Sequence, residues 1–138
     1  PSPPPCSAWA LWLLSNESVR MEENGVVGIF AGIAVRDYPS AVQWYRRLLG
    51  SEPSFYPNDI EAVWQLADDR YVYIIEDHQR AGGAVCMIWL DDPAAEIARI
   101  AERGLEPDEI EKHDNVWKYV FHDADGNEIG IGGDVGSP

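Results

Sequence analysis

The side chains that could ligate a metal or carry a proton are few and widely separated in this sequence. The three histidines lie in polar segments or beside a turn, at His78, His113 and His122. The two cysteines, Cys6 and Cys86, have neither metal-binding nor redox spacing. A divalent cation needs three or four ligands that converge on one point, so these residues would have to approach one another closely to bind one. We expect each histidine to be exposed to solvent or paired with a neighbouring group.

Two further charged residues could take part in chemistry. Glu76 follows a strand-like run and could reach a binding site as a base or a ligand, although a surface carboxylate is the simpler interpretation. Arg80, before a short glycine pair, is expected to pair with nearby acidic groups. Neither residue alone defines a reaction, so function depends on the elements that position the side chains.

The composition is that of an acidic globular protein. Its 138 residues fit one domain or two small fused modules, and a hydrophobic fraction of 46% is enough for a core. A formal net charge of -14 argues against nucleic acid and anionic membrane surfaces as partners, because phosphate groups recruit clustered Lys and Arg. The two cysteines offer no disulfide framework, which predicts a reducing compartment and hence a cytoplasmic location.

Residues 1–20 differ from the rest of the sequence. Residues 1–5 are rich in proline, and the apolar run 8–14 holds two tryptophans but is too short to span a bilayer. A signal peptide would need a basic region and a clean small-residue cleavage site, which the segment lacks. We predict an N-terminal extension of residues 1–20 followed by a single domain of residues 21–138. The alternative is a segment that docks its tryptophans on a partner subunit or on the protein's own sheet.

The remaining sequence alternates between strand-like and helix-like segments. Apolar, β-branched runs predict strands, and apolar residues at helical spacing between a proline and a glycine predict helices. Asp37 is the expected N-cap of the first helix, and Gly50 ends it. Further short strands fit within residues 54–60 and 108–112. The predicted strands are 27–35, 62–66, 71–75, 84–90, 115–121 and 128–131, and the predicted helices start around Pro39 and Pro93.

A tight turn separates the last two predicted strands. The turn sequence is Asp125-Gly126-Asn127, in which glycine and asparagine both tolerate positive φ. The stretch from Phe121 to Ile131 therefore predicts a β-hairpin.

The two halves of the pattern form a repeat. They align at a shift of 54 residues, with Asp69 matched to Asp123. The repeat divides the domain into modules of about residues 26–80 and 84–133, each with the order β-α-β-β. One module could cover only one face of its sheet, which explains why two are fused. The other matched pairs are Asp37 and Asp91, Pro39 and Pro93, Ala41 and Ala95, Gly50 and Gly104, Glu52 and Glu106, and Pro53 and Pro107.

Short motifs mark the first helix and the final turn. They are Val35-Arg36-Asp37, Ala41, Trp44-Tyr45, Leu49-Gly50 and Asp123-Ala124-Asp125-Gly126-Asn127. Together with the repeat, they resemble the vicinal oxygen chelate superfamily, the group of glyoxalase I, bleomycin-resistance proteins, fosfomycin-resistance enzymes and extradiol dioxygenases. The resemblance implies an α+β fold in which two βαβββ modules form a curved, cup-shaped mixed sheet. It implies little about activity, because the group spans lyases, transferases, dioxygenases and binding proteins.

In the enzymes of that superfamily the cup holds a divalent metal through His and Glu on equivalent strands. The resemblance places those ligand positions at Phe30, Ile74, Ala84 and Gly130, and none of these side chains can ligate a metal. Without ligands, the shared metal chemistry has no electrophile. We therefore expect no metal and no other cofactor, and whether the protein is an enzyme stays open.

Strand alternation predicts which side chains line the cup. Aromatic and aliphatic walls, one lysine and small residues at the floor would suit a flat organic ligand. The alternative is that these side chains simply fill the cup. The predicted ligand-binding residues are Phe30, Gly32, Ala34, Trp64, Leu66, Ile74, Ala84, Cys86, Lys118, Val120 and Gly130.

The favoured function is a non-metal, small-molecule-binding protein of the glyoxalase/bleomycin-resistance type, with an apolar or aromatic ligand in the cup or in a groove between subunits. A homodimer is expected, because pairing would cover the edges of two open modules. One alternative is a metal-dependent lyase or dioxygenase with displaced ligands, for which Glu76 and His122 are the candidates. Another is a partner-binding module that docks through its apolar N-terminal segment.

Overall fold

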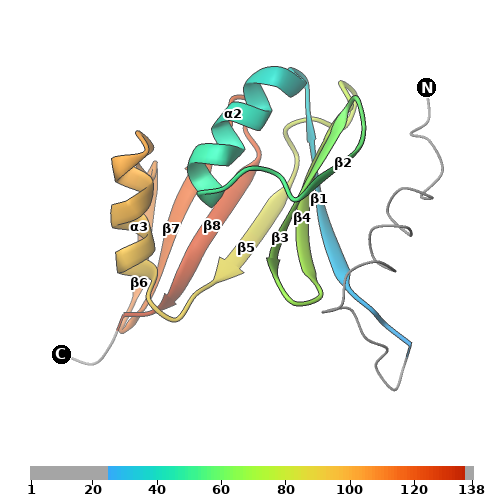
Figure 1. The fold of residues 1–138 in the computed structure, drawn as a ribbon. Coiled ribbons are helices and arrows are strands. Elements are labelled where there is room, and N and C mark those ends of the chain that lie inside the picture. The colour runs from blue at the N-terminus through green and yellow to red at the C-terminus, as the bar shows by residue number, and fades with distance from the viewer. Residues whose placement is uncertain (1–24, 136–138) are drawn as a thin grey trace.

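The computed structural model describes residues 25–135, and the predicted extension of residues 1–20 lies outside them. The described chain forms two four-stranded mixed sheets and two helices (Figure 1). The first module comprises β1 (Ile29–Val35), α2 (Tyr38–Leu49), β2 (Phe55–Asn58), β3 (Glu61–Ala67) and β4 (Arg70–Glu76). The second module comprises β5 (Val85–Trp89), α3 (Pro93–Glu102), β6 (Glu109–His113), β7 (Val116–His122) and β8 (Glu128–Asp134).

The two sheets have the same topology. The strand order is β1-β4-β3-β2 in the first sheet and β5-β8-β7-β6 in the second. In each sheet the first strand runs parallel to the last, after a crossover that includes the helix, and the other neighbours are antiparallel. The expected α+β fold of two βαβββ modules is confirmed, including the short strands β2 and β6.

Both helices are capped by aspartate, with an offset of one residue between the modules. Asp37 accepts a hydrogen bond from the Ser40 N–H at 3.2 Å, and Gly50 follows α2 with a φ of 80°. In the second module the cap is Asp92, which accepts from the Ala95 N–H at 3.1 Å. The cap shifts because proline is the first residue of α3 but the second residue of α2. Within residues 25–135 neither helix is long and apolar enough to cross a membrane.

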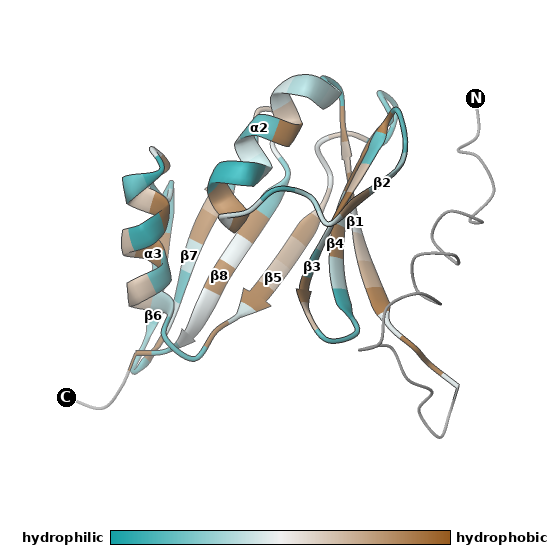
Figure 2. Ribbon diagram, viewed as in Figure 1, coloured by the Kyte–Doolittle hydropathy of each residue, from teal (hydrophilic) through white to brown (hydrophobic). Residues whose placement is uncertain are grey.

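One hydrophobic core joins the two modules. It lies between the helices and the sheet faces that they cover, and both sheets contribute to it. Figure 2 shows that hydrophobic and less hydrophobic residues alternate along β8. The hydrophobic Ile129 and Ile131 belong to the core. Because both sheets give one face to this core, their opposite faces point away from it, and we call these the distal faces. The largest fully buried core side chains are Ile33, Tyr45, Leu48, Trp64, Ile74, Ile100, Phe121 and Ile129.

The predicted β-hairpin is present, and it also fastens the second module to the first. Gly126 adopts a φ of 92° in its turn. The Asn127 amide donates to the Ala34 carbonyl of β1 at 2.8 Å, and its oxygen accepts from two backbone N–H groups before β5 at 3.1 and 2.9 Å. Beside it, Asp123 accepts a hydrogen bond from the Tyr45 hydroxyl of α2 at 2.8 Å. The turn therefore contacts a strand, a linker and a helix outside its own hairpin.

Candidate functional site

Three aromatic rings share the distal face of the first sheet. Phe30 and Tyr71 are neighbours in the parallel pair of β1 and β4, and their rings stack with centroids 4.2 Å apart and planes at 9°. In the next row of that face Gly32 lies opposite Tyr73, whose ring would be 2.6 Å from a Cβ at residue 32. The glycine therefore makes room for the tyrosine ring. We call Phe30, Tyr71 and Tyr73 the aromatic group.

The predicted lining residues of β1 lie together on this face. Phe30, Gly32 and Ala34 alternate along the strand with residues that enter the core. Tyr71 and Tyr73 belong to the same face but are absent from the predicted set. Their alternation in the sequence Tyr-Val-Tyr was the available signal, because it places both tyrosines on one side of β4.

Trp64 and Ile74, which were predicted to line the cup with Phe30, lie on the opposite face of the sheet. Trp64 and Ile74 are fully buried in the core on the face covered by α2, where the Trp64 indole N–H donates to a backbone carbonyl at 2.9 Å. Leu66 lies at a register irregularity between β3 and β4 and is 39% exposed, so the strand pairing does not fix its face. The sheet register pairs Ile74 with Ile33, which is a core residue, and this pairing sets the face.

The same one-residue error affects the second module. Ala84 and Cys86 were expected to face the cup, but they are partly buried and pack against the core. Burial raises the pKa of the Cys86 thiol, which keeps it protonated. The register of β5 with β8 places Met87 opposite Gly130, and so decides the face. The β5 residues on the distal face are Val85, Met87 and Trp89, of which Val85 is 76% and Trp89 60% exposed.

Lys118, Val120 and Gly130 share the distal face of the second sheet, as alternation predicted. The aliphatic stem of Lys118 passes over Gly130, where an added Cβ would come 2.5 Å from the lysine Cε. The Lys118 ammonium donates to Glu128 Oε2 at 3.0 Å. This hydrogen bond raises the pKa of Lys118, so the side chain is a fixed cation on this face.

The line of polar side chains continues from Glu128 to His122. The His122 Nδ1 lies 3.0 Å from Asp108 Oδ2, and the same oxygen accepts the His122 backbone N–H at 2.9 Å. The His122 Nε2 lies 4.0 Å from Glu128 Oε1, which is beyond direct hydrogen-bond distance. Asp108, His122, Glu128 and Lys118 therefore form a continuous line, which we call the polar row. The spacing of residues in the sequence did not predict the polar row. Asp108 precedes a short edge strand, so its partner could not be inferred.

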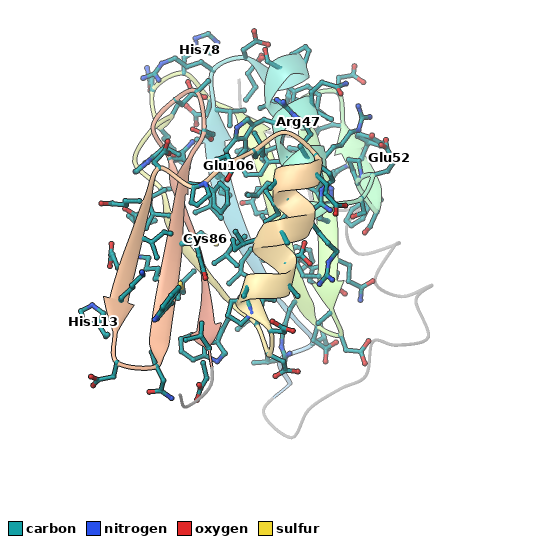
Figure 3. All side chains as sticks on the ribbon, turned by 90° about the vertical axis from the view of Figure 1, so that its left-hand side faces the viewer. Arg47, Glu52, His78, Cys86, Glu106 and His113 are labelled. Carbon is teal, nitrogen blue, oxygen red and sulfur yellow. The ribbon has the colours of Figure 1, made fainter. Side chains whose placement is uncertain are left out.

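The other candidates from the sequence lie apart from the aromatic group and the polar row. His78 and His113 are exposed near opposite ends of the molecule (Figure 3). Glu76 Oε1 accepts the Tyr38 N–H at the start of α2, at 3.3 Å. Arg80 pairs with a neighbouring aspartate at 3.6 Å, as expected.

Metal ligands do not converge in the described part of the chain. Across residues 25–135 there is no group of three or more His, Cys, Asp or Glu side chains that could hold a metal ion. Glu76 and His122, the candidate displaced ligands, lie in different modules, and each is bonded within its own module. The structure therefore does not bring this pair together into a ligand set.

Comparisons with known proteins give matches among solved structures. No protein-family model and no curated protein matches the sequence. A glyoxalase/bleomycin resistance protein from Catenulispora acidiphila is 44% identical, with a TM-score of 0.75 over 77% of this chain and 96% of that chain.

Two more distant structures share the fold. A bleomycin-binding protein complexed with bleomycin is 17% identical, with a TM-score of 0.59 over 77% of this chain and 97% of that chain. A lactoylglutathione lyase from Agrobacterium tumefaciens is 15% identical, with a TM-score of 0.61 over 76% of this chain and 91% of that chain.

Proposed function

This chain belongs to the glyoxalase/bleomycin-resistance family, and we propose that it binds a small planar organic molecule against the distal face of its first sheet. The observation that carries this proposal is the aromatic group, in which Phe30 and Tyr71 stack beside Tyr73. Aromatic rings favour flat ligands through stacking, edge contacts and burial of apolar area. Gly32 lets the Tyr73 ring lie across β1, which brings the three rings together on one face.

We further propose that a second copy of the chain closes the site. The two distal faces point away from a shared core, so within one copy neither sheet covers a ligand on the distal face of the other. At the edge of the second sheet, β5 presents Val85, Met87 and Trp89 to solvent, which favours an apolar partner on that side. A homodimer with the second sheet of one copy opposite the first sheet of the other would enclose the ligand. It would also bring the polar row close to it.

We propose that binding needs no metal and no other cofactor. Phe30, Ile74, Ala84 and Gly130 occupy the positions at which the resemblance places metal ligands, and their side chains carry no ligating atom. Ile74 and Ala84 also pack in or against the core, away from the distal faces. The net charge of -14 favours small molecules over nucleic acid as partners, and the absence of a disulfide framework in the sequence favours a cytoplasmic setting.

Isothermal titration calorimetry against planar aromatic compounds tests this function. Bleomycin is included because a structural relative binds it. We expect saturable binding by at least one planar compound, and about 10-fold weaker binding by Phe30→Ala because a stacking surface is lost. Ile29→Ala is the matched control, since it shortens the adjacent, exposed residue of the same strand. Equal loss in both variants would contradict the proposal.

Elemental analysis and gel filtration test the two remaining parts. We expect purified protein without stoichiometric Zn, Ni, Mn or Fe, and binding that survives a chelator. We also expect a dimer that dissociates when Trp89 is replaced by Asp, because the new charge would be buried at the interface. A ligand that binds only metal-loaded protein contradicts the metal-free site, and a monomer that binds with full affinity contradicts closure by a second copy.

A further inference from the structure

We propose that His122 Nε2 and Glu128 Oε1 form a binding position for a protonated amino group. The inference rests on the proposed function, because it assigns the polar end of the same ligand. The two atoms are 4.0 Å apart on the distal face of the second sheet. A single nitrogen can lie about 2.9 Å from both acceptors at once and donate to each.

Asp108 fixes which nitrogen of His122 accepts. Its Oδ2 lies 3.0 Å from Nδ1, so the proton of the neutral ring belongs on Nδ1, as the hydrogen bond requires. That leaves the lone pair of the neutral ring on Nε2, which lies 4.0 Å from Glu128 Oε1. The backbone N–H of His122 also donates to Asp108, at 2.9 Å, which holds the two residues in register. Nε2 is therefore an oriented acceptor when the ring is neutral.

Lys118 fixes the second acceptor. Its ammonium donates a hydrogen bond to Glu128 Oε2 at 3.0 Å. The other oxygen, Oε1, lies 4.0 Å from His122 Nε2 and does not receive this bond. The lysine reaches Glu128 because Gly130 lets its stem pass across the face. The side chains of His122 and Glu128 remain 38% and 27% exposed, so a ligand can reach both from solvent. The position is thus built by side chains on two strands and in the turn before β6.

The surrounding charge selects a cation. Glu109 and Glu111 on β6 lie opposite Val120 and Lys118 in the same sheet, and their carboxylates add to the negative potential. A carboxylate ligand would meet Glu128 with like charge, whereas an ammonium group would meet a carboxylate and a ring nitrogen. The ligand class that fits both distal faces is a planar aromatic compound with a primary amino group.

Titration of the full chain with three naphthalene derivatives tests the assignment. The probes are 2-naphthylmethylamine, 2-naphthylmethanol and 2-naphthoate, which share the planar ring and differ in charge. At pH 7.5 we expect the amine to bind about 10-fold more tightly than the alcohol, and the carboxylate to bind most weakly. His122→Phe, which keeps an aromatic ring but removes both ring nitrogens, and Glu128→Gln should both lose the preference for the amine. The control Glu111→Gln removes one carboxylate of the same sheet and should keep that preference.

Each outcome of this titration supports or overturns the assigned amino-group position. If Glu111→Gln lost the preference for the amine to the same extent, the negative potential of the whole sheet would explain that preference. The inference of a two-atom position would then be overturned. Binding of the alcohol without preference for the amine overturns the inference and leaves the proposed function intact. Failure of all three probes to bind overturns both. Nitrogen-15 correlation spectra of the histidines provide a separate readout, because neutral His122 must show the Nδ1–H tautomer, and the Nε2–H tautomer overturns the inference without any ligand.

Discussion

The Tyr45 hydroxyl of α2 donates a 2.8 Å hydrogen bond to Asp123 Oδ2 in the turn of the other module, and both residues are buried. The second oxygen of Asp123 accepts the N–H groups of Asp125 and Asn127, each at 2.9 Å. One carboxylate therefore shapes the turn and ties it to the first module. Burial, followed by the charge of Asp123, raises the pKa of Tyr45 far above its ordinary value, so the hydroxyl remains a donor.

Tyr45→Phe should lower the free energy of unfolding by about 1–3 kcal/mol, because a buried carboxylate oxygen loses its hydroxyl donor. Urea denaturation at neutral pH measures the change. The control is Tyr56→Phe, an exposed tyrosine whose hydroxyl lies 3.5 Å from an Arg46 nitrogen and which should lose less than about 0.5 kcal/mol. Similar losses in the two variants would remove the special role of the pair.

Stability should also decline in alkali through Tyr45. The folded protein holds the Tyr45 proton more tightly than the unfolded chain, whose tyrosine titrates near the ordinary value of 10.0. The contribution is thus fully present below that value and is lost as the pH rises toward the folded pKa. Urea midpoints between about pH 9 and pH 11.5 should fall less steeply in Tyr45→Phe than in the parent protein. Parallel curves for the two proteins would count against this linkage.

Gly133→Ala should destabilise the fold by about 1–3 kcal/mol through overpacking. An added Cβ would overlap the backbone oxygen of Leu90 and lie 3.2 Å from the Pro93 ring, at the start of α3. Neither neighbour can rotate away. Gly83→Ala is the matched control, because nothing lies within 4 Å of a Cβ there, and its melting temperature should be unchanged. A Gly133→Ala protein that melts with the parent would show that α3 can shift to accept the methyl group.

Arg103→Lys should lower stability by about 1 kcal/mol, because lysine cannot reproduce a forked contact. The Arg103 guanidinium donates to the carbonyl oxygens of Arg47 and Leu48 at the end of α2, and to Glu96 on its own helix. Arg99→Lys is the control, since Arg99 pairs with Glu96 on an exposed helix face and should contribute little. Chemical denaturation compares the two, and equal effects would mean that the contact between the helices adds nothing.

The fold could be predicted from sequence because its signals are local or repeated. Aspartate caps, helical spacing, a glycine turn and the repeat each identify an element without knowledge of the partner strand. The faces of the strands were predictable only where the chain gave the phase directly, as for Phe30 and Gly32. For Ile74 and Cys86 the phase depends on register with a strand far away in sequence, and an error of one residue moves a side chain to the other face.

The candidate site was less predictable for the same reason. The contact between Asp108 and His122 exists because β6 and β7 pair in one register, and Tyr45 meets Asp123 across 78 residues of sequence. Contacts of that kind arise from tertiary packing, so the types of the individual residues along the chain do not predict them. Alternation placed Lys118 on the face that the structure shows for it, but it did not indicate that Glu128 is its partner.

The exposed strand β5 makes ionic strength a controlling variable for this protein. Its Val85 and Trp89 favour association, while a net charge of -14 makes every copy repel every other. Added salt shortens the range of the repulsion to about 8–10 Å near physiological strength and leaves the apolar attraction in place. Molecules should therefore stay apart in dilute buffer and associate as salt rises, so the colloidal behaviour of a preparation would depend on its counterions.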